Sequence, residues 1–154
     1  MTTPTPSGNR LRSLTDAEIT AILDGFASPM RLASLSPNGF PLISTLWFIY
    51  EEGRFWCITQ QRTLLRRNLA ADPRCAFEIG LEGQRFKLLR GQGLATLDLE
   101  DGRRVTEWMI SRYIKDPNGH AARTLRSQIP TEYAIAINPR WVRGQGAGAM
   151  RKKQ

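Results

Sequence analysis

The feature that most constrains the fold is a segment, residues 31–80, in which apolar runs of strand length follow one another with short connections. The Ser-Pro-Asn-Gly sequence at residues 36–39 is typical of a tight turn, because proline fixes φ and Asn-Gly tolerates positive φ. Cys75, Phe77 and Ile79 alternate with Ala76, Glu78 and Gly80, which is the pattern of a half-buried strand. Connections of hairpin length join antiparallel strands, so the segment predicts an antiparallel sheet.

Residues 42–50 are predicted to form a single strand that is apolar on both faces. The side chains of one face are Leu46, Phe48 and Tyr50, and those of the other are Ile43, Trp47 and Ile49. A strand of this kind is covered on both sides. We therefore expect one face to fill a barrel interior and the other to meet a further element.

Helices are expected before Pro29, at residues 64–71 and at residues 101–114, and residues 120–129 are ambiguous, with a helical turn as one interpretation. The first helix starts with a capping box, because Thr15 and Glu18 have the spacing at which each side chain bonds the other's backbone amide.

Further strands are expected at residues 85–99, 132–138 and 139–143, the first of them bent at Gly91 and Gly93. The chain then has six or seven strands and two or three helices. This pattern predicts a mainly β, α+β fold, an antiparallel β-barrel with flanking helices.

The 154 residues are enough for one domain with one core. We place this domain at residues 14–143, between a flexible N-terminal segment (1–13) and a flexible basic tail (144–154). The net charge of +8 predicts attraction to anions, which include nucleic acid, acidic membrane surfaces and phosphorylated or polycarboxylate ligands. Part of this charge lies near the chain ends, so charge alone does not choose the partner.

Several kinds of site lack support in the sequence. Cys57 and Cys75 have no metal-ligand spacing and no histidine cluster, so no metal site and no disulfide framework are expected, and both are predicted to be buried thiols. His120 has no acidic residue or nucleophile near it, which argues against a hydrolytic triad. The glycines at residues 144–148 precede no helix, so they are not a dinucleotide fingerprint.

A cytoplasmic protein is expected, because neither a secretory signal nor an apolar run of the roughly 20 residues of a membrane span is visible.

The best candidate for a ligand site is the polar loop at residues 59–67. Its hydroxyls, amides and cations belong to Thr59, Gln60, Gln61, Arg62 and Thr63, with Arg66 and Arg67 on the following helical turn. Such groups at a helix N-terminus make anion sites, which predicts a phosphate cradle. The alternative is that the polar residues only cap the helix and the arginines form its solvated face.

The order of these signals is similar to that of a known family. The matching residues read RLASL at 31–35, PNGFP at 37–41, LWF at 46–48, GRFW at 53–56, Thr59, and RNLAADPR at 67–74. This series resembles the pyridoxamine 5′-phosphate oxidase-like family of flavin-binding split β-barrels. Its most specific marks are the Asn-Leu-x-x-Asp-Pro-Arg element and the Trp-Phe strand. The resemblance covers residues 30–97 well and extends in outline to residue 143.

The resemblance implies a homodimer, in which two split barrels lie side by side and bind two flavins in clefts between them. The partner subunit would then cover the second apolar face of residues 42–50. The residues implied to line the isoalloxazine ring are Ser44, Thr45, Leu46 and Trp47, and those implied to hold the phosphate are Thr59, Gln60, Gln61, Arg62 and Arg66. Lys87 is a further candidate for contact with cofactor or substrate, and no catalytic side chain is assigned.

Leu65 departs from the family pattern. The family often has a lysine three residues before the Asn of Asn-Leu, which is the position of Leu65 here. Either Arg66 or Arg62 replaces that lysine, since a guanidinium binds phosphate with two donors, or the cofactor site has shifted or been lost.

Members of the family bind FMN or the deazaflavin F420, and the cations near the loop, with Lys87 and Arg90, suit either anion.

The leading hypothesis is a flavin-dependent oxidoreductase, with FMN favoured over F420, that transfers hydride to or from an unidentified small molecule. Pyridoxamine phosphate oxidase activity itself is disfavoured, because the chain is short and residues 140–143, RWVR, only partly match the C-terminal Trp-Arg-Leu element of those enzymes. The alternative is a non-catalytic module: a barrel that stores or senses a flavin, or a basic barrel that binds single-stranded nucleic acid. Nucleic acid is the less favoured partner, because the strand aromatics are expected to fill a core.

Overall fold

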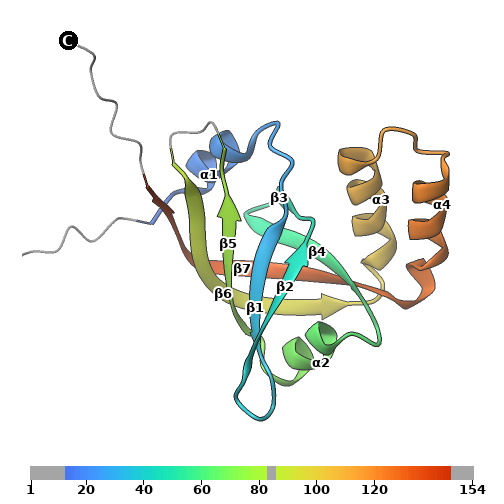
Figure 1. Cartoon of the computed structure of the whole chain (residues 1–154), viewed down its shortest axis with the longest axis horizontal. Coiled ribbons are helices and arrows are strands. Elements are labelled where there is room, and N and C mark those ends of the chain that lie inside the picture. The colour runs from blue at the N-terminus through green and yellow to red at the C-terminus, as the bar shows by residue number, and fades with distance from the viewer. Residues whose placement is uncertain (1–12, 83–85, 147–154) are drawn as a thin grey trace, which may run out of the picture.

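The computed structural model describes residues 13–82 and 86–146. Within these ranges seven strands form one sheet in the order β2-β1-β5-β6-β7-β4-β3, with every neighbouring pair antiparallel. The strands are β1 (Met30–Leu35), β2 (Pro41–Leu46), β3 (Ile49–Glu51), β4 (Arg54–Gln60), β5 (Arg74–Gly80), β6 (Leu88–Asp98) and β7 (Glu132–Gln145). Figure 1 shows β6 and β7 sweeping across the molecule, so that the sheet curls into a half-barrel.

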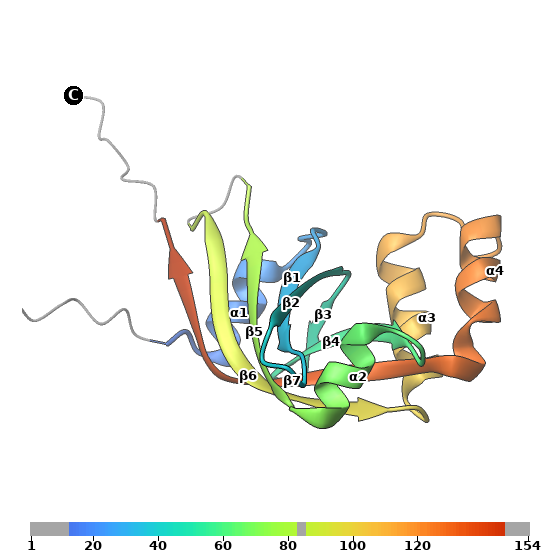
Figure 2. The same ribbon diagram turned by 60° about the horizontal axis from the view of Figure 1, so that its bottom comes forward.

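Helices flank this sheet, as the sequence predicts. The helices of the described ranges are α1 (Asp16–Leu23), α2 (Leu64–Ala71), α3 (Gly102–Tyr113) and α4 (His120–Ser127), with a 3-10 turn at Ile129–Thr131. The predicted capping box is present at the start of α1, where Glu18 N donates to Thr15 Oγ1 at 3.2 Å. Figures 1 and 2 place α3 and α4 side by side at one end of the sheet, away from α1. The predicted antiparallel split barrel with flanking helices is confirmed.

The core has two parts that share β4 and β7. Phe55 and Ile137 are fully buried inside the half-barrel, where they pack with apolar side chains of β1, β5 and β6. Trp56 points to the opposite side of β4 and packs with Val105 and Met109 of α3. Alternate side chains of β4 therefore fill the barrel interior on one face of the sheet and pack against α3 on the other.

The bend of β6 is located at its glycines, as predicted. The register with β7 shifts between Gln92 and Gly93, which marks a β-bulge. A Cβ on Gly93 would lie 2.5 Å from the backbone oxygen of Asn138, and one on Gly91 would overlap the Phe77 ring. Close approach of neighbouring backbone and side chains therefore requires glycine at both positions.

The prediction of one strand over residues 42–50 is wrong, because these residues form two strands at opposite edges of the sheet. β2 ends at Leu46 and β3 begins at Ile49, so only Trp47 and Phe48 connect the two edges. Two residues span at most roughly 11 Å between the flanking Cα atoms. The edges of the sheet therefore approach each other at this point, and the remaining gap between β2 and β4 is the split of the barrel.

The C-terminal boundary also differs from the prediction. Residues 132–138 and 139–143 form one continuous strand, β7, because the bulge opposite Gly93 lets the pairing with β6 continue past Pro139. The strand includes Gly144 and Gln145, which we had expected in the tail. The rest of the predicted tail and residues 1–12 lie outside the described residues.

Two observations apply to residues 13–82 and 86–146 only. No helix there is long and apolar enough to span a membrane, and no group of three or more His, Cys, Asp or Glu residues is placed to hold a metal ion. Cys57 and Cys75 are free thiols buried in the core, as predicted.

Candidate functional site

Trp47 marks the point where the chain crosses between the two edges of the sheet. Its indole stacks on the Tyr113 ring with centroids 4.8 Å apart and planes at 8°, yet the residue remains 42% exposed. The Tyr113 hydroxyl donates to Phe48 O at 2.6 Å, which fixes the supporting ring, and burial raises the pKa of Tyr113 above its usual value. An indole supported on one face and open elsewhere can stack on a planar ligand ring.

The other three predicted ring-contact residues precede Trp47 on β2. Ser44 and Leu46 are half-buried toward the interior, and Thr45 is exposed on the outer face, where its hydroxyl accepts from Arg31 Nη1 at 2.5 Å. β2 pairs only with β1 and is therefore an edge strand of the sheet. Its second edge has backbone groups available to a ligand or a partner.

Helix α2 brings the predicted phosphate loop to the same split. The loop follows β4, which continues to Gln60 beyond its pairing with β3. At the other side of the helix, Asn68 Nδ2 donates to Ser34 Oγ of β1 at 3.1 Å, next to β2. The helix therefore lies between the end of β4 and the β1–β2 side of the sheet, as Figure 2 shows, and the predicted phosphate loop leads into its N-cap at Thr63.

Two of the predicted loop hydroxyls serve the helix cap. Thr59 Oγ1 and Thr63 Oγ1 lie 2.7 Å apart, and Thr63 Oγ1 accepts from Arg66 N at 3.1 Å as the N-cap of α2. Thr59 is only 6% exposed. The capping interpretation thus holds for these two residues. The backbone amides of Leu64 and Leu65 have no hydrogen-bond acceptor within the helix, because no helical carbonyl precedes the first turn.

The side chain of Gln60 is occupied within the protein. Its Nε2 donates to the Glu132 carboxylate and to Gln128 O at 3.3 Å, and its Oε1 accepts from Thr131 Oγ1 at 2.6 Å. Glu132 is 4% exposed, and burial raises the pKa of its carboxyl above the usual value, with the bond from Gln60 opposing that shift. Sequence reasoning missed Glu132, because nothing in the local pattern indicates a partner 72 residues away.

The cations of the loop remain on the surface. Arg62 is exposed and forms no hydrogen bond or ion pair with another described residue. Arg66 is half-buried, with Nε donating to Gln61 O at 2.8 Å and its guanidinium 5.9 Å from the centre of the Tyr133 ring. The backbone of Gln61 thus orients Arg66 while its own side chain stays exposed. Arg62 and the terminal nitrogens of Arg66 can bind an anion.

Leu65 lies in the apolar core, with 4% exposure, on the buried face of α2. A neighbouring residue on a helix points roughly 100° away. Arg66 can replace a lysine at position 65 only if its side chain approaches the anion from a different face of the helix. The hydrogen bond from Arg66 Nε to Gln61 O directs the side chain in this way.

Lys87 lies apart from the loop in one chain. It immediately precedes β6 and is exposed, with its backbone bonded to Leu81 and Gln145. The loop lies beside the other end of β6, where Asp98 pairs with Ala134. The 11 residues of β6 would extend roughly 36 Å if fully straight, and the bend shortens this only in part.

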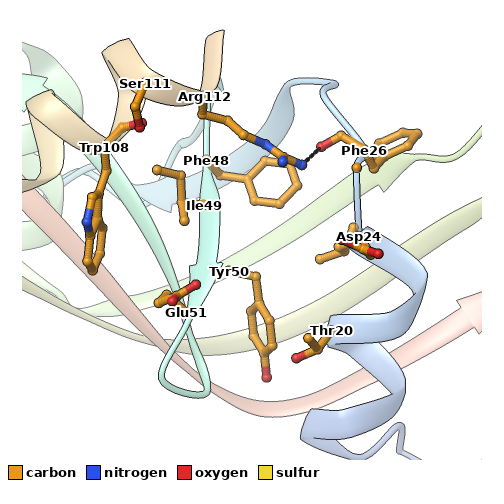
Figure 3. Close-up of a pocket in the computed structure, with 12 residues that line it drawn as sticks. Thr20, Asp24, Phe26, Phe48, Ile49, Tyr50, Glu51, Trp108, Ser111 and Arg112 are labelled. Carbon is orange, nitrogen blue, oxygen red and sulfur yellow. Dashed lines mark hydrogen bonds between the residues drawn. The ribbon is translucent and has the colours of Figure 1, made fainter.

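A separate pocket of about 380 Å³ lies between α1, β3 and α3. Figure 3 shows Phe48 and Ile49 inside it and charged side chains at its rim, with Arg112 Nη2 donating to Phe26 O at 2.6 Å. It contains none of the predicted site residues. Trp108 and Arg112 are one helical turn apart and therefore lie on the same face of a helix. This spacing is the sequence signal that could have indicated the pocket.

The outer face of the sheet exposes apolar side chains at β2, β1, β5 and β6. Phe40 is 74% exposed, Ile43 is 70% exposed and Leu94 is 42% exposed. Shallow hollows of about 290 and 400 Å³ lie on this face, and Ala76 lines both. An apolar surface of this kind marks an interaction site more often than an isolated exposed leucine does.

Comparison with protein families gives one match over most of the chain. The model of the pyridoxamine 5′-phosphate oxidase family matches residues 15–146. No curated protein matches the sequence.

Solved structures share the fold at low identity. An F420 reductase is 16% identical with a TM-score of 0.65, covering 80% of this chain and 94% of its own. A conserved hypothetical protein from Mycobacterium tuberculosis is 19% identical with a TM-score of 0.73, covering 91% of this chain and 89% of its own. The heme storage protein HutZ from Vibrio cholerae is 19% identical with a TM-score of 0.64, covering 86% of this chain and 95% of its own. At these identities the likeness shows the fold alone.

Proposed function

Because the chain belongs to the pyridoxamine 5′-phosphate oxidase family, we propose that it is a flavin-dependent oxidoreductase, with FMN as its cofactor in preference to F420. The observation that carries this proposal is the split itself. Trp47, an exposed indole supported on one face, connects the two edges of the sheet, and the loop before α2 carries the exposed Arg62 and the half-buried Arg66. A planar ring system with a phosphate at the end of a chain matches this combination of groups.

The residues present fit such a cofactor. Trp47 would stack against the ring, and the backbone edge of residues 44–46 would bond the polar side of the ring. Arg62, Arg66 and the first-turn amides of α2 would bind the phosphate, because guanidinium groups and helix N-termini both favour anions. When bound, the flavin supplies the hydride chemistry, and the protein contributes orientation and exclusion of water.

We further propose that the protein is a homodimer with the cofactor at the subunit interface. The exposed apolar face around Ile43 and Ala76 supports this, since a second copy would bury it. Lys87 lies too far along β6 to reach the loop of its own chain. In this proposal it contacts the site of the second copy.

The competing functions are less well supported. Phe48, Phe55 and Trp56 are at most 4% exposed, so of the four aromatics at residues 47–56 considered for base stacking, Trp47, Phe48, Phe55 and Trp56, only Trp47 is accessible to a nucleotide base. The sequence has a single histidine, His120, which is exposed at the start of α4. This leaves no histidine on β2 or in the loop to ligate a heme. A barrel that stores or senses flavin without turnover remains the second candidate, because the same binding groups would serve it.

Identification of the bound cofactor tests the proposal. The purified protein, or the protein incubated with FMN or F420, is expected to carry a flavin absorption spectrum, and mass spectrometry of the released compound identifies it. A screen of reductants and electron acceptors then separates an oxidoreductase from a storage barrel. A colourless protein that takes up neither cofactor and retards an oligonucleotide in a gel would overturn the proposal.

A further inference from the structure

Gln60 uses its whole side-chain amide to hold the loop against the start of β7. Its donor bonds the Glu132 carboxylate and Gln128 O, and its acceptor takes the Thr131 hydroxyl. A backbone bond from Gln61 N to Thr131 O, 3.0 Å long, runs alongside. These bonds join the end of β4 to a segment far away in the sequence.

Glu132 provides the fixed end of this network. It is the first residue of β7, pairs with Gln60 in the sheet and is 4% exposed. Its backbone oxygen packs so closely on Gly102 that no Cβ would fit there. A buried carboxyl group next to packed backbone has little freedom to move, so it defines where the Gln60 amide lies.

The network continues from Gln60 to a proposed phosphate-binding cation. Gln61 O accepts from Arg66 Nε at 2.8 Å, and the Arg66 guanidinium lies over Tyr133, the residue next to Glu132. The position of the loop backbone therefore sets the direction of Arg66. A shift of the loop would change the direction of the guanidinium, because Gln61 O would move with it.

We propose that Gln60 and Glu132 are positioning residues, which fix the loop after β4 so that Arg66 faces the phosphate of the bound cofactor. This inference rests on the proposed function. It assigns Gln60 a role different from the direct cofactor contact implied by the family resemblance, because its amide groups already have partners within the chain.

The test compares the dissociation constants of FMN and riboflavin, which differ only in the phosphate. Gln60→Ala is expected to weaken FMN binding about tenfold, the effect of about 1.4 kcal/mol, and to leave riboflavin binding within about twofold. Glu132→Leu should act in the same way. Glu132→Gln should retain the wild-type ratio, because the amide oxygen can accept the same bond from Gln60. If the protein takes up F420 only, the comparison uses F420 and the phosphate-free deazaflavin.

Gln128→Ala is the matched control, since Gln128 contributes only its backbone carbonyl to the network. Urea denaturation of each variant separates lost positioning from lost folding. Where Gln60→Ala does not fold, Thr131→Val removes only the two bonds of the Thr131 hydroxyl, to Gln60 Oε1 and to Gln128 O. An unchanged ratio of FMN to riboflavin affinity in Gln60→Ala, Glu132→Leu and Thr131→Val would overturn the positioning role. A wild-type protein that binds neither cofactor would overturn the proposed function and this inference with it.

Discussion

At the scale of single residues, the site combines side chains that face the split with side chains that support them. Arg62 and Arg66 keep donors at the surface, whereas Gln60, Thr59 and Thr63 spend theirs within the chain. Residues of the same polar type, adjacent in sequence, thus have opposite roles. The difference follows from their partners, because Gln60 bonds the segment that leads into β7, whereas Thr59 and Thr63 bond each other at the N-cap of α2.

Leu65→Lys tests the position at which this chain has leucine and the family often has lysine. The side chain at position 65 lies in the apolar core, so an ammonium there is expected to lower the free energy of unfolding by at least about 2 kcal/mol. Leu65→Met, of similar volume, should cost less than about 1.5 kcal/mol. Urea denaturation measures both. Equal stability of the lysine variant and the wild type would mean that the chain at position 65 reaches solvent beside the loop.

The buried carboxyl group of Glu132 predicts a pH effect on stability. Its pKa is raised in the folded protein, so between the usual value of a glutamate and the raised value the folded state binds more protons than the unfolded state. Stability from this group is full below the usual pKa and falls as pH rises through that window. Glu132→Gln removes the effect, so its stability relative to wild type should increase with pH. Thermal unfolding across that pH range checks this, and a constant difference would contradict it.

At the scale of elements, the bend in the paired strands β6 and β7 determines the shape of the sheet. The bulge between Gln92 and Gly93 increases the local twist. One part of the long strands then packs in the barrel core, and another part packs against α3. Glycine is needed there because backbone atoms of β7 fill the space that a side chain would use.

Gly93→Ala tests this bend against a matched glycine in the same sheet. The new Cβ would lie 2.5 Å from Asn138 O, so the variant is expected to lose about 1–3 kcal/mol of unfolding free energy. Gly80→Ala, where nothing lies within 4 Å, should change stability by no more than about 0.5 kcal/mol. Chemical denaturation of the two variants gives the comparison. Similar values for both would show that β7 moves freely at the bulge.

At the scale of the whole molecule, the outer face of the sheet exposes apolar side chains such as Ile43 and Leu94. The proposed second copy would cover the apolar side chains around Ile43 and carry its own Lys87 toward the neighbouring site. A dimer of this kind would also exclude water from a ring lying along β2, which favours hydride transfer over side reactions.

Ile43→Asp tests the interface. A buried, unpaired carboxylate is costly, so the variant is expected to be monomeric at concentrations where the wild type sediments as a dimer, with an unchanged circular dichroism spectrum. Leu99→Asp is the control, because Leu99 is similarly apolar and 45% exposed but lies after β6 rather than on this face. A monomeric wild type, or a dimeric Ile43→Asp variant, would contradict the proposed interface.

Local structure and family could be predicted from the residue pattern alone. The capping box at Thr15, the turn at residues 36–39, the helix before Asp72 and the glycine bend of β6 are all present where the pattern placed them. These features depend on backbone geometry and on neighbours a few residues away, which a sequence pattern contains. The motif series around the Trp-Phe pair at residues 47–48 and the Asp-Pro-Arg element was sufficient for the family, and the fold followed from it.

The positions of the sheet edges and the partners of the loop's polar side chains could not be predicted, because they depend on contacts between distant segments. An apolar run over residues 42–50 is compatible with one long strand or with two strands at opposite edges, because periodicity does not record a change of pairing partner. The engagement of Gln60 by Glu132 and the burial of Leu65 likewise depend on contacts between distant segments. Such contacts arise when the sheet curls, and they have no trace in local spacing.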